Sequence, residues 1–157
     1  MPTTIWIDGD ACPGAVKEIA LRAAERLRVS SVFVANKPLR LPLSPLVRAV
    51  RVAAGPDVAD SHIVTESAPG DLVVTADIPL AALLVKKGVT AIDPRGTRYD
   101  EENIAERLSV RDLLSGLRDS GEITGGGPSA FDARAKQRFA ATFDACLTRA
   151  LAQQRTG

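Results

Sequence analysis

Short apolar runs alternate with longer amphipathic segments along most of the chain up to Gly96. The short runs are bounded by turn residues, as expected of buried strands, and the longer segments carry apolar residues at helical spacing. The predicted strands are Thr4–Asp8, Ser31–Ala35, Val47–Val52, Leu72–Thr75 and Thr90–Ile92. The predicted helices between them are Pro13–Arg28, Asp57–Ser67 and Pro79–Lys87. Strands and helices in this order indicate a parallel sheet with helices on both faces.

The remainder of the chain is predicted to be helical. Apolar positions indicate a helix over Asn103–Arg118 and a long final helix over Phe131–Gln154. The glycine-rich stretch at 125–128 separates them, and it is not a phosphate-binding P-loop because no Lys-Ser or Lys-Thr pair follows it. We therefore predict a three-layer α/β/α fold with a mostly parallel central sheet of about five strands. Residues 1–157 are expected to form a single domain, with a C-terminal helical extension over about 100–157.

Composition narrows the class of protein without identifying it. Hydrophobic residues make up 45% and charged residues 25% of the chain, which is ordinary for a globular protein. No apolar run approaches the roughly 20 residues needed to span a bilayer. The two cysteines do not form a disulfide framework, and no basic segment followed by an apolar stretch precedes the first strand. These features predict a cytoplasmic protein with free thiols and no membrane partner.

Aspartates follow the predicted strands, and they are the most informative residues for function. Asp8 and Asp10 come at the end of the first strand, Asp77 follows the fourth, and Asp60 lies shortly after the third. Ligands of an open α/β sheet bind outside the carboxyl ends of the strands, so these carboxylates are expected to converge there. Asp57 precedes Asp60 by three residues, which places both on one helix face. Clustered carboxylates repel one another unless a cation lies between them, and their oxygens suit Mg²⁺ or Mn²⁺.

Each aspartate also has a structural alternative. Asp10 could cap the helix that begins at Pro13, Asp77 could cap the helix that follows it, and Asp57 suits a turn. For any one of these residues taken alone, the structural role is the better explanation. For the set as a whole a metal site is favoured, because capping does not explain Asp8. Its carboxylate directly ends a buried strand, where an uncompensated charge is strongly unfavourable.

A basic stretch runs from the end of the first predicted helix through the predicted third strand. Residues 26–56 contain no acidic residue but several cations, of which Arg40, Arg48 and Arg51 could contact the phosphates of a nucleic acid. A solvated surface balanced by acids elsewhere in the fold is an equally good interpretation. Asn36 ends its strand at the same edge as the aspartates, so we include it as a substrate-binding residue.

Three other residues could in principle take part in chemistry, but packing explains them better. Cys12 lies near a helix N-terminus, which can activate a thiol, but the neighbouring aspartates oppose a thiolate. His62 is the only histidine, and it lies within a predicted helix. Trp6 alternates with core residues of the first strand. One histidine and the lack of a nucleophile elbow argue against a Ser-His-Asp hydrolase.

Several motifs are spread over nearly the whole chain. They are IDGDACP at 7–13, FVAN at 33–36, DVAD at 57–60, TADIPLA at 75–81, PRG at 94–96 with Tyr99, RDSG at 118–121, and GGP at 126–128 followed by Phe131. In this order they closely resemble the bacterial YaiI/YqxD family, also called UPF0178. Gly9 is a departure, since alanine is expected at that position, but the change should not disturb a carboxylate site.

The YaiI/YqxD family is similar to PIN-like nuclease domains, which have an α/β/α fold and metal-binding acidic residues at the strand ends. The resemblance therefore implies a PIN-like domain in which Asp8, Asp10, Asp60 and Asp77 are the catalytic, metal-binding positions. It implies Asp57 as a weaker candidate ligand, and Mg²⁺ or Mn²⁺ as the cofactor.

Three functions remain as hypotheses. The first is a metal-dependent ribonuclease or related phosphodiesterase acting on nucleic acid, with single-stranded RNA as the expected partner; a homo-oligomer is compatible with the sequence. Aromatic residues are only 4% of the chain, which argues against base recognition but not against backbone cleavage. The second is a non-catalytic module that binds nucleic acid or a partner. The third is a phosphatase similar to haloacid dehalogenases, because Asp8 and Asp10 flank one glycine after the first strand, although Cys12 departs from that motif.

Overall fold

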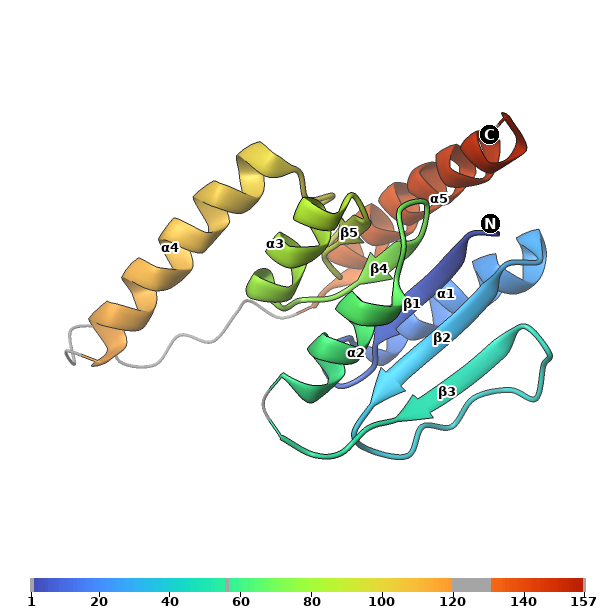
Figure 1. Cartoon of the computed structure of the whole chain (residues 1–157), viewed down its shortest axis with the longest axis horizontal. Helices are drawn as coiled ribbons and strands as arrows, with labels where there is room; N and C mark the ends of the chain where they lie inside the picture. The colour runs from blue at the N-terminus through green and yellow to red at the C-terminus, as the bar shows by residue number, and fades with distance from the viewer. Residues whose placement is uncertain (1, 56, 120–130, 157) are drawn as a thin grey trace.

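A five-stranded parallel sheet forms the centre of the computed structural model, which describes residues 2–55, 57–119 and 131–156 (Figure 1). Its strands are β1 (Thr4–Asp8), β2 (Ser30–Ala35), β3 (Val47–Arg51), β4 (Leu72–Val74) and β5 (Thr90–Ile92). The strand order is β3-β2-β1-β4-β5, and every neighbouring pair is parallel. The predicted parallel sheet is confirmed, and each strand begins and ends within one residue of its predicted bounds.

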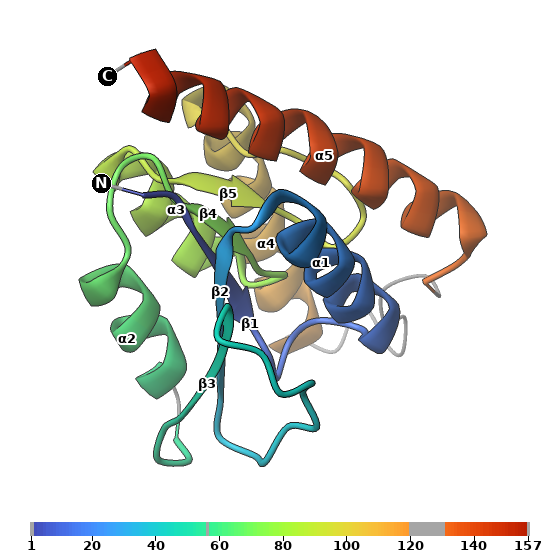
Figure 2. The ribbon, with the colours of Figure 1, turned by 90° about the vertical axis from the view of Figure 1, so that its right-hand side faces the viewer.

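Helices cover both faces of this sheet. They are α1 (Gly14–Leu27), α2 (Val58–Glu66), α3 (Ile78–Lys87), α4 (Glu101–Asp119) and α5 (Ala133–Thr156). Figure 2 shows α1 and α5 on one face and α2 with α3 on the other. Helix α4 packs on α3 and extends away from the sheet (Figure 1). The three-layer α/β/α prediction is thus confirmed, while the predicted break at 125–128 and the motif at 126–128 lie outside the described residues.

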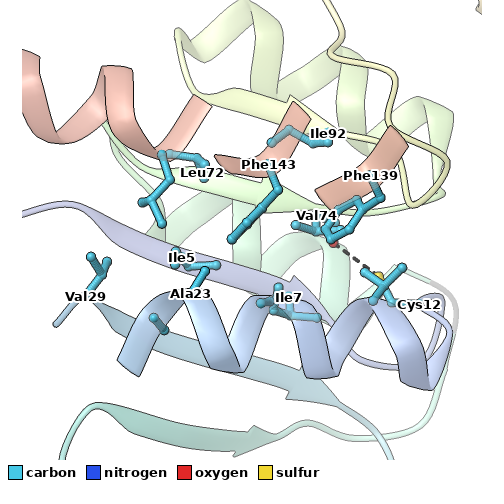
Figure 3. Close-up of a cluster of buried hydrophobic side chains, with 14 of the residues drawn as sticks. Ile5, Ile7, Cys12, Ala23, Val29, Leu72, Val74, Ile92, Phe139 and Phe143 are labelled. Atoms are coloured by element: carbon cyan, nitrogen blue, oxygen red, sulfur yellow. Dashed lines mark hydrogen bonds between the residues drawn. The ribbon is translucent and has the colours of Figure 1, made fainter. Parts of the chain in front are cut away.

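The alternation of side chains along β1 builds two hydrophobic layers. Ile5 and Ile7 point to the α1 and α5 side, where they pack with Phe139 and Phe143 of α5 (Figure 3). The two phenylalanine rings stack with their centroids 5.4 Å apart. Because successive strand residues face opposite sides, Asp8 at the end of β1 faces the α2 and α3 side.

Trp6 anchors the second layer, which packs against α2 and α3. Its indole Nε1 donates a hydrogen bond of 3.0 Å to Asp71, and the backbone amides of Thr4 and Ala68 donate to the same carboxylate at 3.0 Å each. Asp71 is only 8% exposed, so these three donors supply the compensation that a buried charge requires. His62 meets the Trp6 ring edge-on, at a centroid distance of 6.2 Å. The packing interpretation of Trp6 is confirmed.

Two glycines fix turns around the sheet. Gly88 ends α3 in the left-handed conformation that favours glycine, with φ of 87°. Gly96 has φ of 94°, and a Cβ there would lie 2.6 Å from the carbonyl carbon of Arg138. The Gly96 carbonyl also accepts a 2.7 Å hydrogen bond from Thr142 Oγ1. The turn after β5 is therefore held directly against the backbone of α5.

Within the described ranges, no helix is both long enough and apolar enough to cross a membrane.

Candidate functional site

The strand order places β1 at the centre of the sheet and reverses the winding direction between β1 and β4. Ligands of open α/β sheets bind at such a reversal, outside the carboxyl ends of the strands. A cavity of about 320 Å³ opens at this edge. It is lined by every predicted aspartate together with Asn36, namely Asp8, Asp10, Asn36, Asp57, Asp60 and Asp77, and otherwise by small or apolar residues. The structure thus brings together the acidic residues that the sequence placed at one edge.

Asp8 is the most buried of these aspartates, with 4% of its surface exposed. Its Oδ2 accepts a 2.8 Å hydrogen bond from Thr75 Oγ1, and Thr75 Oγ1 in turn accepts a 3.0 Å bond from the Asp77 amide. Burial raises the pKa of Asp8 above its ordinary 3.8, and the charges of Asp77 and Asp10 add to the rise, while the Thr75 hydrogen bond opposes it. The Asp8 carboxyl is therefore held in place by Thr75, the residue after β4, and neighbouring negative charges raise its pKa further.

Thr75 is a site residue that the sequence reasoning did not single out. It is fully buried and links the ends of β1 and β4 through its hydroxyl. The sequence does contain a pattern that could have identified Thr75. It is a hydroxyl residue at a strand end, two positions before an aspartate, and this spacing favours a hydrogen bond between the hydroxyl and the aspartate backbone amide.

Asp10 bridges two strand ends instead of capping a helix. Its Oδ2 accepts a 2.8 Å hydrogen bond from the Asn36 amide, which ties the loop after β1 to the loop after β2. Helix α1 has Pro13 at its N-cap position and no side-chain cap. The capping alternative for Asp10 is therefore wrong, and its carboxylate remains on the cavity wall.

Asp77 combines both of the roles that the sequence offered. Its Oδ1 accepts a 2.9 Å hydrogen bond from the Leu80 amide, so it caps α3 as the structural alternative predicted. The same carboxylate lines the cavity, and its charge is one of the causes that raise the pKa of Asp60. Capping and a place in the acidic site are thus compatible.

Asp60 lies in the first turn of α2 and is half-buried. Burial raises its pKa from the ordinary 3.8 to about 7, with further contributions from the charges of Asp77 and Asp8, the hydrogen bond with Asp77 and the charge of Asp57. The N-cap residue Asp57 has a left-handed backbone, with φ of 65°, and its side chain makes no capping bond. Its exposed carboxylate lies on the wall of the cavity instead.

The carboxylate oxygens on the cavity wall are ligands that a hard divalent cation prefers, but they do not surround a metal position on all sides. Among the residues that the structure describes, no three His, Cys, Asp or Glu side chains are gathered closely enough to enclose a metal ion. The cavity wall nevertheless offers carboxylate oxygens, and Mg²⁺ is commonly bound by one or two carboxylates together with water and phosphate oxygens. Burial raises the pKa of Asp60 most, and the repulsion by neighbouring carboxylates that adds to it is the interaction that a cation would relieve.

The three predicted arginines do not gather at this cavity. Arg40 is exposed in the loop between β2 and β3, and Arg51 ends β3 beside Ala35, at the same edge as the aspartates. Arg48 lies nearer the start of β3 and lines a separate cavity of about 280 Å³ with Thr4 and other residues at the opposite edge. Their role as phosphate contacts stays a prediction, and Arg51 is the one best placed for it.

Cys12 is part of the hydrophobic core beside the site. It is 8% exposed, and its thiol donates a weak 3.5 Å hydrogen bond to the Val74 carbonyl (Figure 3). Burial raises the pKa of this thiol well above its usual range, and the charge of Asp8 adds to the effect. The interpretation of Cys12 as a packing residue is confirmed, because such a thiol is not a nucleophile at neutral pH.

By its structure, the protein is a three-layer α/β/α domain with a parallel sheet. An acidic cavity lies where the winding direction of the sheet reverses, between β1 and β4. The chain belongs to the YaiI/YqxD family, since the model described as "Uncharacterized BCR, YaiI/YqxD family" matches residues 6–149. A UPF0178 protein of Geobacter sulfurreducens is 58% identical over 147 residues, which are 94% of this chain and 97% of that protein. A UPF0178 protein of Myxococcus xanthus is 57% identical over 145 residues, 92% of this chain and 94% of that protein. No solved structure matches the chain.

Proposed function

We propose that this protein is a metal-dependent nuclease that hydrolyses phosphodiester bonds, with single-stranded RNA as its substrate class. The observation that supports this proposal is the convergence of five aspartates from three separate parts of the chain on one cavity at the strand reversal. Structural roles account for Asp77 as a helix cap and for Asp10 as a bridge to β2, but not for Asp57 or Asp60.

Asp8, Asp60 and Asp77 would hold a Mg²⁺ or Mn²⁺ ion, one or two of them directly and the rest through coordinated water, and Asp10 would orient water or a second ion. When bound, the ion would supply Lewis-acid activation of water and of a phosphodiester oxygen. Because the pKa of Asp60 is raised to about 7, its proton must leave before its carboxylate can coordinate, so ion affinity should increase with pH. The hydrogen bond from Thr75 would keep Asp8 oriented toward the cavity. Arg51, at the same edge, would attract the nucleic-acid backbone.

The test is a cleavage assay with purified protein, single-stranded RNA and a generic phosphomonoester, each with Mg²⁺, Mn²⁺ or EDTA. We expect metal-dependent RNA cleavage that Asp8→Asn and Asp60→Asn abolish. Asp112→Asn provides a matched control, because Asp112 is an exposed aspartate on α4. Cleavage that persists in Asp8→Asn would refute the proposal and indicate a contaminating nuclease.

Two other outcomes point to the alternative functions. Turnover of the phosphomonoester with phosphate transferred to Asp8 would identify a phosphatase. RNA binding that is independent of metal and survives Asp8→Asn and Asp77→Asn, without cleavage, would identify a binding module.

A further inference from the structure

A second polar cavity lies at the opposite edge of the sheet from the aspartates. Its volume is about 240 Å³, and it lies between the turns that precede β4 and β5 and the C-terminal half of α5. The polar residues on its wall are Thr90, Arg98, Cys146, Arg149 and Gln153. Because Gly70 and Gly88, which also line it, precede their strands, this cavity is at the amino edge, whereas the acidic cavity is at the carboxyl edge.

The fold brings the two arginines to this cavity from distant parts of the chain. The segment after β5 folds back along that strand, with an antiparallel bridge between Ile92 and Arg98 and a 2.9 Å hydrogen bond from the Tyr99 amide to the Ala91 carbonyl. Ile92 belongs to the hydrophobic layer under α5, so its bridge partner lies beside α5 as well. Arg149 follows Cys146 by three residues on α5, which places both on one helix face.

The guanidinium groups of Arg98 and Arg149 line the same cavity and both influence Cys146 on its wall. Both lower the pKa of the Cys146 thiol, against the larger effect of burial, which raises it. None of the described residues that line the cavity is acidic. Within the part of the chain that the structure describes, neither Arg98 nor Arg149 forms an ion pair, whereas Arg26 in the same helical layer is paired with Asp144 at 2.7 Å. Two cations that share a concave site without a carboxylate repel one another, and a bound anion would relieve that repulsion.

We propose that this cavity binds a dianionic phosphate group between Arg98 and Arg149. Guanidinium groups present parallel N–H donors that match phosphate oxygens two at a time, and two of them can engage a tetrahedral dianion from different sides. The hydroxyl of Thr90, on the same face of β5 as Ile92, adds a neutral donor. The ligand is either inorganic phosphate or the terminal phosphate of a nucleotide, and this site is independent of the carboxylate cavity.

The thiol of Cys146 provides a built-in probe for this site. It is half-buried on the cavity wall, so a bound anion should shield it from the neutral reagent iodoacetamide. Alkylation of the full-length protein would be followed by peptide mass mapping, with increasing inorganic phosphate or adenosine 5′-monophosphate at constant ionic strength. Cys12, which is buried in the core, reports in the same sample on any global opening.

We expect phosphate to slow alkylation of Cys146 and not that of Cys12. Arg98→Gln and Arg149→Gln should each raise the phosphate concentration for half-protection about tenfold, as expected when a charge-assisted hydrogen bond is lost. Arg134→Gln, an exposed arginine on the same helix, should leave it unchanged. Stronger protection by adenosine 5′-monophosphate would identify a nucleotide phosphate as the ligand, and stronger protection by inorganic phosphate would identify the free ion.

Two results would overturn the proposal. One is equal slowing by chloride at the same ionic strength, which would show general screening. The other is wild-type protection in both glutamine variants after circular dichroism has shown that they are folded.

Discussion

The carboxyl of Asp60 should make the folded protein less stable at neutral pH than a neutral side chain of the same shape would. Burial and the charges of Asp77 and Asp8 raise its pKa from 3.8 to about 7. A group with a higher pKa in the folded state binds more protons when folded than when unfolded. Stability is therefore greatest below pH 3.8 for this group and falls as the pH rises through the window from 3.8 to about 7. Asp60→Asn removes this loss, because an asparagine side chain carries no charge at any of these pH values.

The size of the effect follows from the same pKa difference. At 1.36 kcal/mol per pKa unit, a rise to about 7 corresponds to at most about 4 kcal/mol. Asp60 is half-exposed, so solvent screening reduces this value to about 1–2 kcal/mol at pH above the window. For a chain of this length, that gain in unfolding free energy corresponds to a rise in melting temperature of about 5 °C.

The assay is thermal unfolding followed by circular dichroism at about pH 3 and about pH 8, on either side of the window in which the stability difference develops. Asp60→Asn should melt at a higher temperature than the wild type at the higher pH, and the difference should vanish at the lower pH. Asp112→Asn on α4 controls for the removal of one exposed carboxylate. The reasoning is refuted if Asp60→Asn has no advantage at the higher pH, or the same advantage at both.

A divalent cation should stabilise the wild-type protein at high pH, as the Asp60→Asn substitution does. If Mg²⁺ or Mn²⁺ binds among these carboxylates, adding it at about pH 8 should raise the melting temperature of the wild type, because a ligand that binds only the folded state stabilises it. The rise should be smaller in Asp60→Asn and reversed by EDTA. An equal rise in both proteins would show that the ion binds elsewhere.

Three further substitutions test the fold around the two cavities. Asp71→Ala leaves the indole N–H of Trp6 and two backbone amides without their acceptor, so urea unfolding followed by the fluorescence of this single tryptophan should show a loss of about 3 kcal/mol. Gly96→Ala should cost about 3 kcal/mol by the same measurement, because its Cβ would overlap the α5 backbone, and a neutral outcome would show that the turn can move away. Gly9→Ala places a Cβ 3.0 Å from Leu39 Cδ1 and should cost about 1 kcal/mol, a loss that should shrink in a Leu39→Ala background if that contact is its cause.

The sequence was sufficient to predict the elements and the acidic edge. Short apolar runs bounded by turn residues identified the strands, because a strand buried on both faces has no other pattern. Once the strands are parallel, their carboxyl ends meet at one edge, and the aspartates that follow them must lie close together. This argument needs no knowledge of the strand order, which is why it succeeded for Asp8, Asp10, Asp60 and Asp77.

Features that depend on contacts between distant segments could not be predicted in this way. Arg48 and Arg51 differ by only three positions, but strand β3 carries one toward each edge of the sheet. The cavity between Arg98 and Arg149 exists because the segment after β5 folds back beside α5, and no local pattern encodes that pairing. The hydrogen bond from Thr75 to Asp8 likewise joins residues 67 positions apart.

The direction of the helices favours carboxylates at the carboxyl edge of the sheet. Helices that follow parallel strands begin at the carboxyl edge, and a helix N-terminus stabilises a nearby negative charge by about 0.3–1 kcal/mol, as its C-terminus stabilises a positive one. Asp60 lies in the first turn of α2, so the dipole alone would favour its charged form and lower its pKa. The pKa of Asp60 is instead raised to about 7, so burial and repulsion among the carboxylates outweigh the helix. A set of residues present only to cap helices would not accumulate that repulsion, and the divalent cation of the proposed function would supply the compensating charge.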